Sequence, residues 1–221
     1  MSARPSTLSG HSSDAFPTVV GLALVASCGV AAYFIITSAA SYLLDMTAAV
    51  YGRFWSSRHF MFVHIAAGAL ALIAGAVQFC LAFAQRTSTA HRWIGRVYHG
   101  AVLVSCVASL LILRNGSVAG PMWVALLVTL AVCTLVFTTC GLVEARRRRW
   151  LHHSAWMLRS YAGMMVFAWF RLVWELPVLH TLPQGTRAAT VLAVTMLLTF
   201  AATELLLLMR TRRLQSPLVR V

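Results

Sequence analysis

The residues best suited to chemistry gather in three short stretches of an otherwise apolar chain. Residues 90–99, AHRWIGRVYH, contain two histidines, two arginines, a tryptophan and a tyrosine, and residues 150–163, WLHHSAWMLRSYAG, contain two further histidines. A third stretch, HIAAGALALIAGAVQ, begins at His64 and ends at Gln78. Neutral imidazole is a common ligand of transition metals and of haem iron, so these stretches indicate metal, haem or proton chemistry.

The positions of the histidines along predicted helices decide which of them can act together. His91 and His99 are eight residues apart on one helix. This separates them by about 12 Å along the axis and about 80° around it, so they cannot share one metal ion. His153 lies on a different helix and is expected at the same membrane face as His91. His91 and His153 are therefore the expected axial ligands of a b-type haem.

Further residues would complete such a haem site. Arg92 and Arg159 can neutralise the haem propionates, and Tyr98 and Trp156 can pack on the macrocycle. His64 is expected near the opposite face of the membrane and is a third candidate ligand. Its candidate partners there are His59 and His180. The spacing permits haem ligation without requiring it, because no CxxCH motif marks covalent attachment.

A stripe of small and polar residues runs along the predicted helix that begins near His64. His64, Gly68, Ala71, Gly75 and Gln78 recur at spacings of four and three residues, so they share one helical face. Small residues at this spacing are typical of close helix packing in membranes. The other interpretation is a groove that accepts a flat cofactor, with His64 as a ligand or hydrogen-bond partner.

Two oppositely charged residues lie within one predicted membrane span. Arg171 and Glu175 are four residues apart, and Arg171 shares a helical face with His153, eighteen residues earlier. Ionisable groups in a membrane are costly and usually face the protein interior. The pair is expected either to close the bundle as an ion pair or to bind a polar ligand and relay protons. Glu204 is expected to extend its carboxylate toward the membrane surface.

Composition identifies the medium in which these residues act. The chain has 221 residues, of which 60% are hydrophobic and only 10% charged. Its mean hydropathy of +0.79 excludes an ordinary water-soluble domain, whereas a bilayer accepts this much apolar surface. Six apolar stretches are long enough, or nearly so, to cross the hydrocarbon layer. They are residues 18–44, 59–84, 90–113, 121–143, 154–179 and 188–209.

The sequence therefore predicts an all-α polytopic protein, a bundle of six transmembrane helices. Residues 1–17 form a polar N-terminal tail, residues 18–209 the membrane domain, and residues 210–221 a basic C-terminal tail. All 18 basic residues are arginines. Thirteen of them fall on one side of the predicted membrane and four on the other, which predicts that both termini are cytoplasmic.

The net charge of +13 is explained by this topology. The arginines lie in short connections between apolar segments, where they can contact anionic lipid headgroups of the bilayer. No nucleic-acid partner is needed. The expected location is the inner (cytoplasmic) membrane of a bacterium, which the chain crosses several times.

The three stretches also resemble a known family. HIAAGALALIAGAVQF, HRWIGRVY and HSAWMLRSY, followed by an arginine in the same helix, resemble an uncharacterised family of bacterial predicted membrane proteins, domain of unknown function 2306. The resemblance covers roughly residues 60 to 175 and implies the membrane fold but no activity. The residues that it carries over are His64, Gly68, Gly75, Gln78, His91, Arg92, Gly95, Tyr98, His153, Trp156, Met157, Arg159 and Arg171. The six-helix plan is also loosely similar to diheme b-type cytochromes.

Three functional classes remain open at this point. The leading specific hypothesis is a b-type haem or quinone-linked transmembrane electron carrier with a membrane redox partner. The alternative is a non-catalytic membrane scaffold, assembly factor or small-molecule permease. The third, a metal-dependent membrane hydrolase, needs three ligands at one depth together with an acid or base. Carboxylates are scarce on the face where the histidines gather, and no GxSxG or HExxH motif occurs.

Overall fold

The computed structural model describes residues 15–84, 89–114, 120–181 and 183–215, and the regular structure in these ranges is entirely helical. The six long helices are α1 Ala15–Phe34, α4 Arg58–Phe83, α5 Thr89–Leu113, α6 Gly120–Arg146, α7 Trp150–Trp174 and α8 Gln184–Gln215. Shorter elements join them: a π-helix η1 Ile35–Ala39, α2 Ala40–Leu44, α3 Ala48–Tyr51, and the 3-10 helices η2 Gly52–Ser57 and η3 Pro177–Thr181. The predicted all-α bundle is confirmed.

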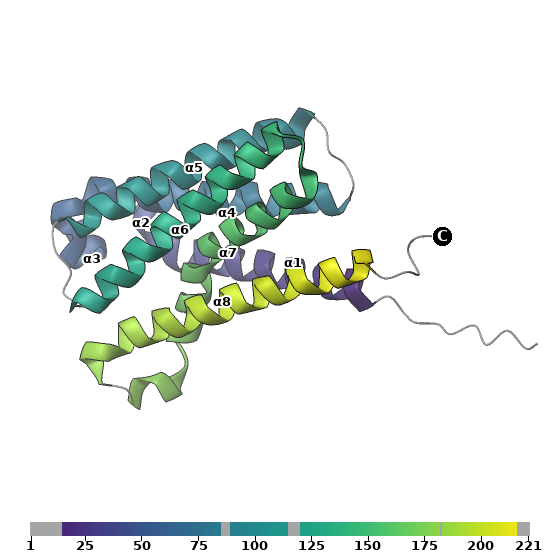
Figure 1. Cartoon of the computed structure of the whole chain (residues 1–221). Coiled ribbons are helices and arrows are strands. Elements are labelled where there is room, and N and C mark those ends of the chain that lie inside the picture. The colour runs from purple at the N-terminus through teal and green to yellow at the C-terminus, as the bar shows by residue number, and fades with distance from the viewer. Residues whose placement is uncertain (1–14, 85–88, 115–119, 182, 216–221) are drawn as a thin grey trace, which may run out of the picture.

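Five segments are long and apolar enough to cross a bilayer. They are Thr18–Leu44, Ala48–Ala82, Thr89–Leu113, Gly120–Arg146 and Thr186–Gln215. Helix α7 is the sixth predicted crossing, and its 25 residues rise about 37 Å. It packs against α1, α4, α6 and α8, so neighbouring helices cover much of its surface (Figure 1).

The structure shortens this sixth span at its far end. The predicted crossing of residues 154–179 corresponds to a helix that begins at Trp150 and ends at Trp174. Pro177 supplies the reason, because proline has no backbone N–H and disfavours helical geometry in the residue before it. Glu175 therefore caps the helix, and η3 follows.

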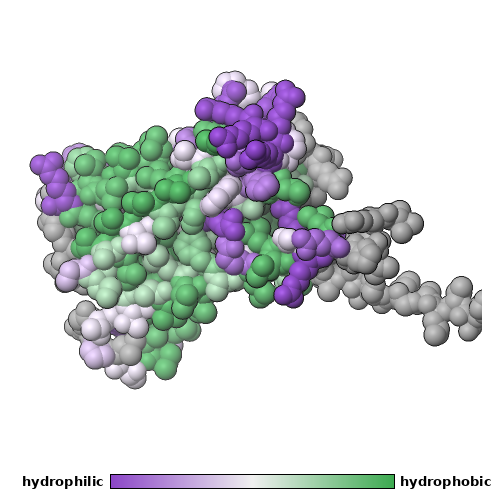
Figure 2. Space-filling model, in the orientation of Figure 1, coloured by the Kyte–Doolittle hydropathy of each residue, from purple (hydrophilic) through white to green (hydrophobic). Residues whose placement is uncertain are grey.

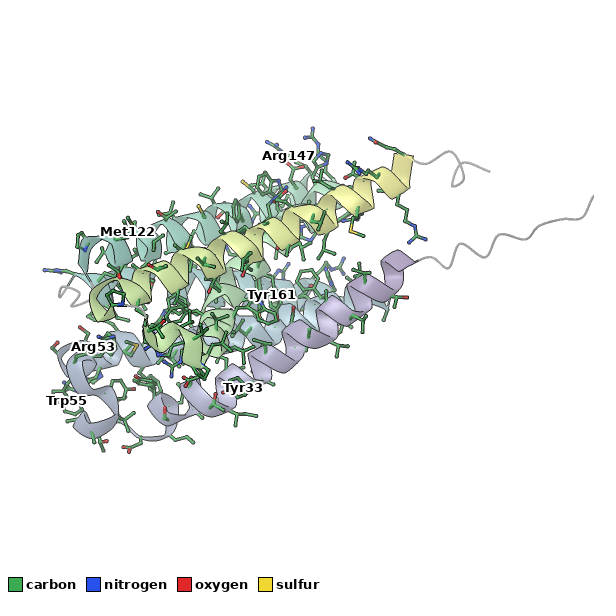
Figure 3. The ribbon with its side chains drawn as sticks, turned by 90° about the horizontal axis from the view of Figure 1, so that it is seen from below. Tyr33, Arg53, Trp55, Met122, Arg147 and Tyr161 are labelled. Carbon is green, nitrogen blue, oxygen red and sulfur yellow. The ribbon has the colours of Figure 1, made fainter. Side chains whose placement is uncertain are left out.

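The described ends of the chain lie at the same end of the bundle. Figure 1 shows the start of α1 beside the end of α8, as an even number of crossings requires. Arg147 lies at this end, while Arg53 and Trp55 lie at the opposite end and Tyr161 between them (Figure 3). Which end faces the cytoplasm stays a prediction. Helix α8 continues to Gln215, so the described part of the predicted basic tail is helical.

The lateral surface is apolar and the interior contains several small residues. Figure 2 shows a broad hydrophobic surface along the helices, with hydrophilic residues gathered toward the ends. Inside, α7 approaches its neighbours at two glycines. A Cβ atom on Gly163 would overlap the Thr134 hydroxyl of α6, and one on Gly75 of α4 would overlap the Tyr161 ring of α7. Close approach of the helices therefore depends on these missing side chains.

We predict that Gly163→Ala lowers the stability of the bundle by about 1–3 kcal/mol, because the added methyl group forces Thr134 and α6 away from α7. Thermal unfolding of the purified protein in detergent measures this loss. Gly100→Ala is the matched control, since a Cβ atom there meets nothing within 4 Å. Equal melting temperatures for the two variants would show that helix contact at Gly163 is not tight.

Candidate functional site

One ring nitrogen of His153 is held by a hydrogen bond. Its Nδ1–H donates to the backbone oxygen of Gly141 on α6, at an N···O distance of 2.8 Å. This bond assigns the neutral tautomer in which Nε2 carries the lone pair. Metal-binding histidines commonly have this arrangement, with the second nitrogen bonded to a backbone carbonyl. His153 is therefore oriented as a ligand or as a proton acceptor.

His91 lies near His153, as the sequence predicts. The two side chains are close enough to interact electrostatically. The backbone oxygen of His91 accepts a hydrogen bond of 2.5 Å from the Gln78 amide of α4, which holds the start of α5 against α4. The Nδ1 atom of His91 is buried and has no hydrogen-bond partner among the described residues. Such a nitrogen is unusual in a native structure, because a buried polar atom normally has a partner.

The other residues expected around a haem are engaged elsewhere. Tyr98 is 1% exposed, and its hydroxyl lies 2.8 Å from the Ser160 hydroxyl of α7. The Ser160 hydroxyl in turn lies 2.5 Å from that of Thr138 on α6. This chain of three hydroxyls joins α5, α7 and α6 in the core. Tyr98 thus binds the helices together instead of facing an open pocket beside His91.

Arg159 and Trp156 form a second cluster, on the side of α7 that faces α8. The guanidinium of Arg159 donates two hydrogen bonds of 2.6 and 2.8 Å to the carboxylate of Glu204. It also lies 5.0 Å from the ring centre of Trp156, which stacks on Phe137 at 5.8 Å. Glu204, which the sequence predicts to extend toward the membrane surface, instead pairs with Arg159. Arg92 is exposed and donates to the Thr89 hydroxyl.

The stripe of small residues on α4 is a packing seam. A Cβ atom on Gly68 would lie 3.3 Å from the Ser105 hydroxyl of α5, and one on Gly95 of α5 would lie 3.6 Å from the Gln78 amide nitrogen. Gly75 makes room for two tyrosine rings. Most of the stripe therefore serves close packing between helices, as one of the two interpretations predicted. Its other end, at His64, borders a cavity.

His64 is anchored in the same way as His153. Its Nδ1 lies 2.9 Å from the backbone oxygen of Ser105 and 3.1 Å from the Ser105 hydroxyl. The Ser105 hydroxyl also donates to the backbone oxygen of His64 at 3.1 Å. Because Nδ1–H donates to a carbonyl, Nε2 carries the lone pair. Of its suggested partners, His59 is exposed at the start of α4, and the side chain of His180 lies outside the described part of the chain.

The cavity beside His64 has a volume of about 550 Å³. Its walls come from α1, η1, α2, η2, α4, α5, α6 and α7, so segments distant in the sequence line one cavity. Most of the lining is apolar. The polar and charged side chains that border it include Ser38, Arg53, His64, Ser105, Thr134 and Arg171. A largely apolar chamber with a few polar groups is the usual form of a small-molecule site.

Arg171 borders this cavity and does not pair with Glu175. Its Nε atom donates to the Ser38 hydroxyl of the π-helix at 3.3 Å. Glu175 is exposed at the end of α7 and forms no ion pair within the described residues. The expected pair fails to form because the helix ends at Trp174, so Glu175 is not held on the face of Arg171. Arg171 instead joins α7 to the π-helix at the cavity wall.

Sequence reasoning did not identify Ser38, Arg53 or Ser105 as site residues. Ser105 lies in the middle of an apolar run, and Arg53 lies in the connection between the first two predicted spans. The one available signal for Ser105 is that a hydroxyl within a membrane span usually has a partner on another helix. Nothing in the local sequence indicates that this partner is His64.

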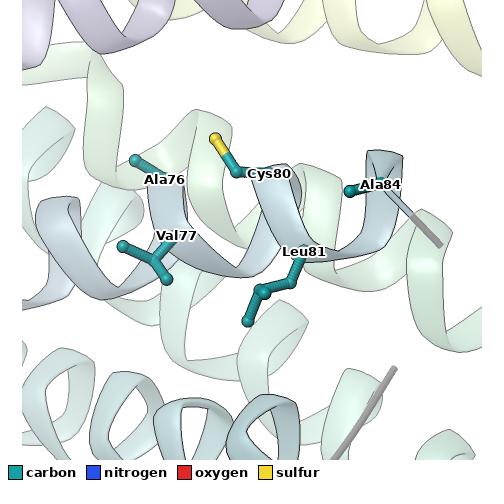
Figure 4. Close-up of a pocket in the computed structure, with 5 residues that line it drawn as sticks. All are labelled: Ala76, Val77, Cys80, Leu81 and Ala84. Carbon is teal, nitrogen blue, oxygen red and sulfur yellow. The ribbon is translucent and has the colours of Figure 1, made fainter. Parts of the chain in front are cut away.

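A second, shallow groove runs along α4 near its end. Figure 4 shows its lining, Ala76, Val77, Cys80, Leu81 and Ala84, all from that one helix. The groove contains no charged group and no histidine. Across the described residues, no three side chains of histidine, cysteine, aspartate or glutamate are placed to hold one metal ion. The hydrolase hypothesis, which needs three such ligands, therefore gains no support.

Comparison with known proteins connects these features to one family. The family described as a predicted membrane protein (DUF2306) matches residues 61–208 of the chain. The match covers His64, His91 and His153, and the pair formed by Arg159 and Glu204. No curated protein and no solved structure matches the chain.

We expect Glu204→Gln to destabilise the bundle by about 1–3 kcal/mol, because it leaves the Arg159 guanidinium without its carboxylate between α7 and α8. The double variant Arg159→Leu, Glu204→Leu restores much of the loss, since it removes both charges. Glu144→Gln is the control, because its contacts with Arg147 and Arg149 are longer, at 3.5 and 3.9 Å. Melting temperatures in detergent distinguish these variants, and a neutral effect of Glu204→Gln would contradict the expectation.

Proposed function

The chain belongs to the DUF2306 family of predicted membrane proteins, and on that premise we propose that it binds a small amphipathic molecule in the cavity beside His64. The role is that of a ligand-binding membrane protein or permease, the non-catalytic class that the sequence leaves open. One observation carries the proposal: eight elements line a single, largely apolar cavity that a histidine, two arginines and several hydroxyls border.

The size and lining of the cavity suit this role. A volume of about 550 Å³ falls within the range of small-molecule sites in proteins. Aliphatic and aromatic side chains from α4, α5, α6 and α7 provide most of its surface, while the polar groups can orient a headgroup. Polar side chains at membrane depth are costly unless they have partners or a function. A ligand headgroup gives several of these groups a partner at once.

His64 can act on such a ligand through its Nε2 atom. Because Ser105 fixes the Nδ1–H, the Nε2 lone pair is available to accept a hydrogen bond or a proton. The two contacts from Ser105 also restrict rotation of the ring. His64 is therefore preorganised to receive a donor from the ligand without reorganising its surroundings.

A redox role is the second candidate, and the orientation of His153 favours it. Its Nε2 atom is free to ligate iron, and the buried Nδ1 atom of nearby His91 lacks a partner. A b-type haem held by these two residues would supply electron transfer, with a quinone or a membrane redox partner as the other reactant. Arg92 could meet a propionate, whereas Arg159 is already paired with Glu204. The location that goes with either role is the bacterial cytoplasmic membrane.

Filling the cavity tests the first proposal. Ser109 borders the cavity and bonds only within its own helix, so Ser109→Phe places a ring in the chamber without breaking a contact between helices. We expect it to weaken labelling of cavity-lining residues by a photoreactive alkyl diazirine by about tenfold or more.

Val107→Phe is the matched control for that experiment, because Val107 is exposed on the outer surface of the same helix. Wild type and Val107→Phe should be labelled at residues lining the cavity, as peptide mass spectrometry of the cross-linked protein can show. Labelling confined to outward-facing residues in all three proteins would exclude a ligand-accessible cavity.

A dithionite-reduced minus oxidised visible spectrum tests the redox candidate. The protein is purified in detergent from cells supplied with a haem precursor. If haem is bound, the α-band of six-coordinate b-type haem is present in wild type and in His99→Ala, and lost in His91→Ala and His153→Ala. The melting temperatures show whether the variants remain folded. A flat spectrum from fully supplied cells would refute the haem hypothesis and leave the cavity proposal intact.

A further inference from the structure

We propose that the ligand of this cavity is an amphipathic anion, with its negative headgroup at Arg53 and Arg171 and its apolar chain along the inner walls. The inference rests on the proposed function, since it names the chemical class of the ligand at the same site. It follows from three observations: the charges that border the cavity, the partners those charges lack, and the apolar interior beyond them.

The charges bordering the cavity are all of one sign. Arg53 of η2 and Arg171 of α7 both line it, and none of its described lining residues is acidic. The two arginines come from segments more than a hundred residues apart, so the fold itself brings them to one chamber. Guanidinium groups are always protonated and match carboxylate or phosphate oxygens with paired N–H donors.

Neither arginine has an anionic partner within the described protein. Arg171 donates one hydrogen bond, to Ser38, although a guanidinium carries five N–H donors. Arg53 lies over the Phe54 ring at 4.9 Å. The nearest acidic residues in the chain, Asp45 and Glu175, are exposed, and the described ion pairs include neither. A ligand anion therefore supplies the charge that the protein does not.

The contrast with Arg159 supports this interpretation. Arg159 lies on the same helix and holds Glu204 through two short hydrogen bonds. The fold thus neutralises the arginine that packs between α7 and α8. Arg171, which lines the cavity, has no carboxylate partner among the described residues. The difference is explained if the counter-ion of Arg171 enters from outside the chain.

The cavity extends inward from the arginines along apolar walls. Gly163 and Arg171 both line it and are eight residues apart on α7, so its length along the helix is about 12 Å. Leu72, Ile112, Leu127, Leu130 and Phe167 are among the side chains that form the inner walls. Figure 3 shows Arg53 at one end of the molecule and Tyr161 near its middle, so the charged wall lies toward the bundle end.

This arrangement fits a headgroup at the membrane boundary and a chain directed inward. A fatty acid carboxylate and the phosphate of a membrane lipid share this chemistry, an anion attached to a flexible apolar chain. The experiment below separates the two sources while testing the shared feature.

Binding of palmitate and of hexadecanol to the full chain in detergent tests the inference directly, because the two probes share an alkyl chain and differ in headgroup charge. We expect palmitate to bind at least about tenfold more tightly than hexadecanol, which is the ratio that one hydrogen bond to a charged group provides. Arg171→Gln should remove most of this preference, because it weakens palmitate binding far more than hexadecanol binding. Arg58→Gln is the control, because Arg58 stacks on Trp55 near the same end and does not line the cavity.

Native mass spectrometry of the same preparations identifies the source of the anion. Retention of an anionic phospholipid by wild type and Arg58→Gln, and its loss in Arg171→Gln, supports the inference with a lipid as ligand. Palmitate preference without retained lipid supports it with a free carboxylate as ligand. Equal binding of palmitate and hexadecanol overturns the anionic class and leaves the cavity proposal standing. Failure of both probes to bind, with no lipid retained, overturns both.

Discussion

Hydrocarbon does not form hydrogen bonds, and this constraint governs the arrangement of every polar side chain in the bundle. Helix α7 lies among four neighbours that can satisfy its polar side chains. The hydroxyl chain Tyr98, Ser160 and Thr138 and the ion pair of Arg159 with Glu204 are two consequences. The glycines opposite α7 let the helices come close enough for these short contacts to form.

The fold could be predicted to a large extent from apolar length alone. Six long hydrophobic stretches and the breaks between them correspond closely to α1 with its extension, α4, α5, α6, α7 and α8. The features that the sequence did not indicate are local. The early end of α7 follows from Pro177, which a prediction from apolar length alone does not take into account. Nothing in the local sequence explains the π-helix at residues 35–39.

The candidate site could be predicted only in part. Residue spacing shows which side chains share a helical face, but it does not show which residue of another helix each of them contacts. The proximity of His91 to His153 follows from the topology, since both begin helices at one end of the bundle. The partner of His64 is a serine inside an apolar run, and the partner of Arg171 is a serine in the π-helix. Arg171 and Glu175 have the right spacing for an ion pair, but the helix ends between them.

The boundary of the family match has a consequence for how ligand preference can evolve. The match begins at residue 61, yet Phe34, Ser38 and Tyr42 line the cavity from the segment before it. Ala31 and Ala39 are the only fully buried side chains described in α1, η1 and α2, whereas Phe34 also packs against the core. Substitutions at Ser38 or Tyr42 therefore alter one wall of the cavity without removing a fully buried side chain. If the cavity holds a ligand as proposed, its preference can diverge between related proteins while the residues of the family match keep the scaffold.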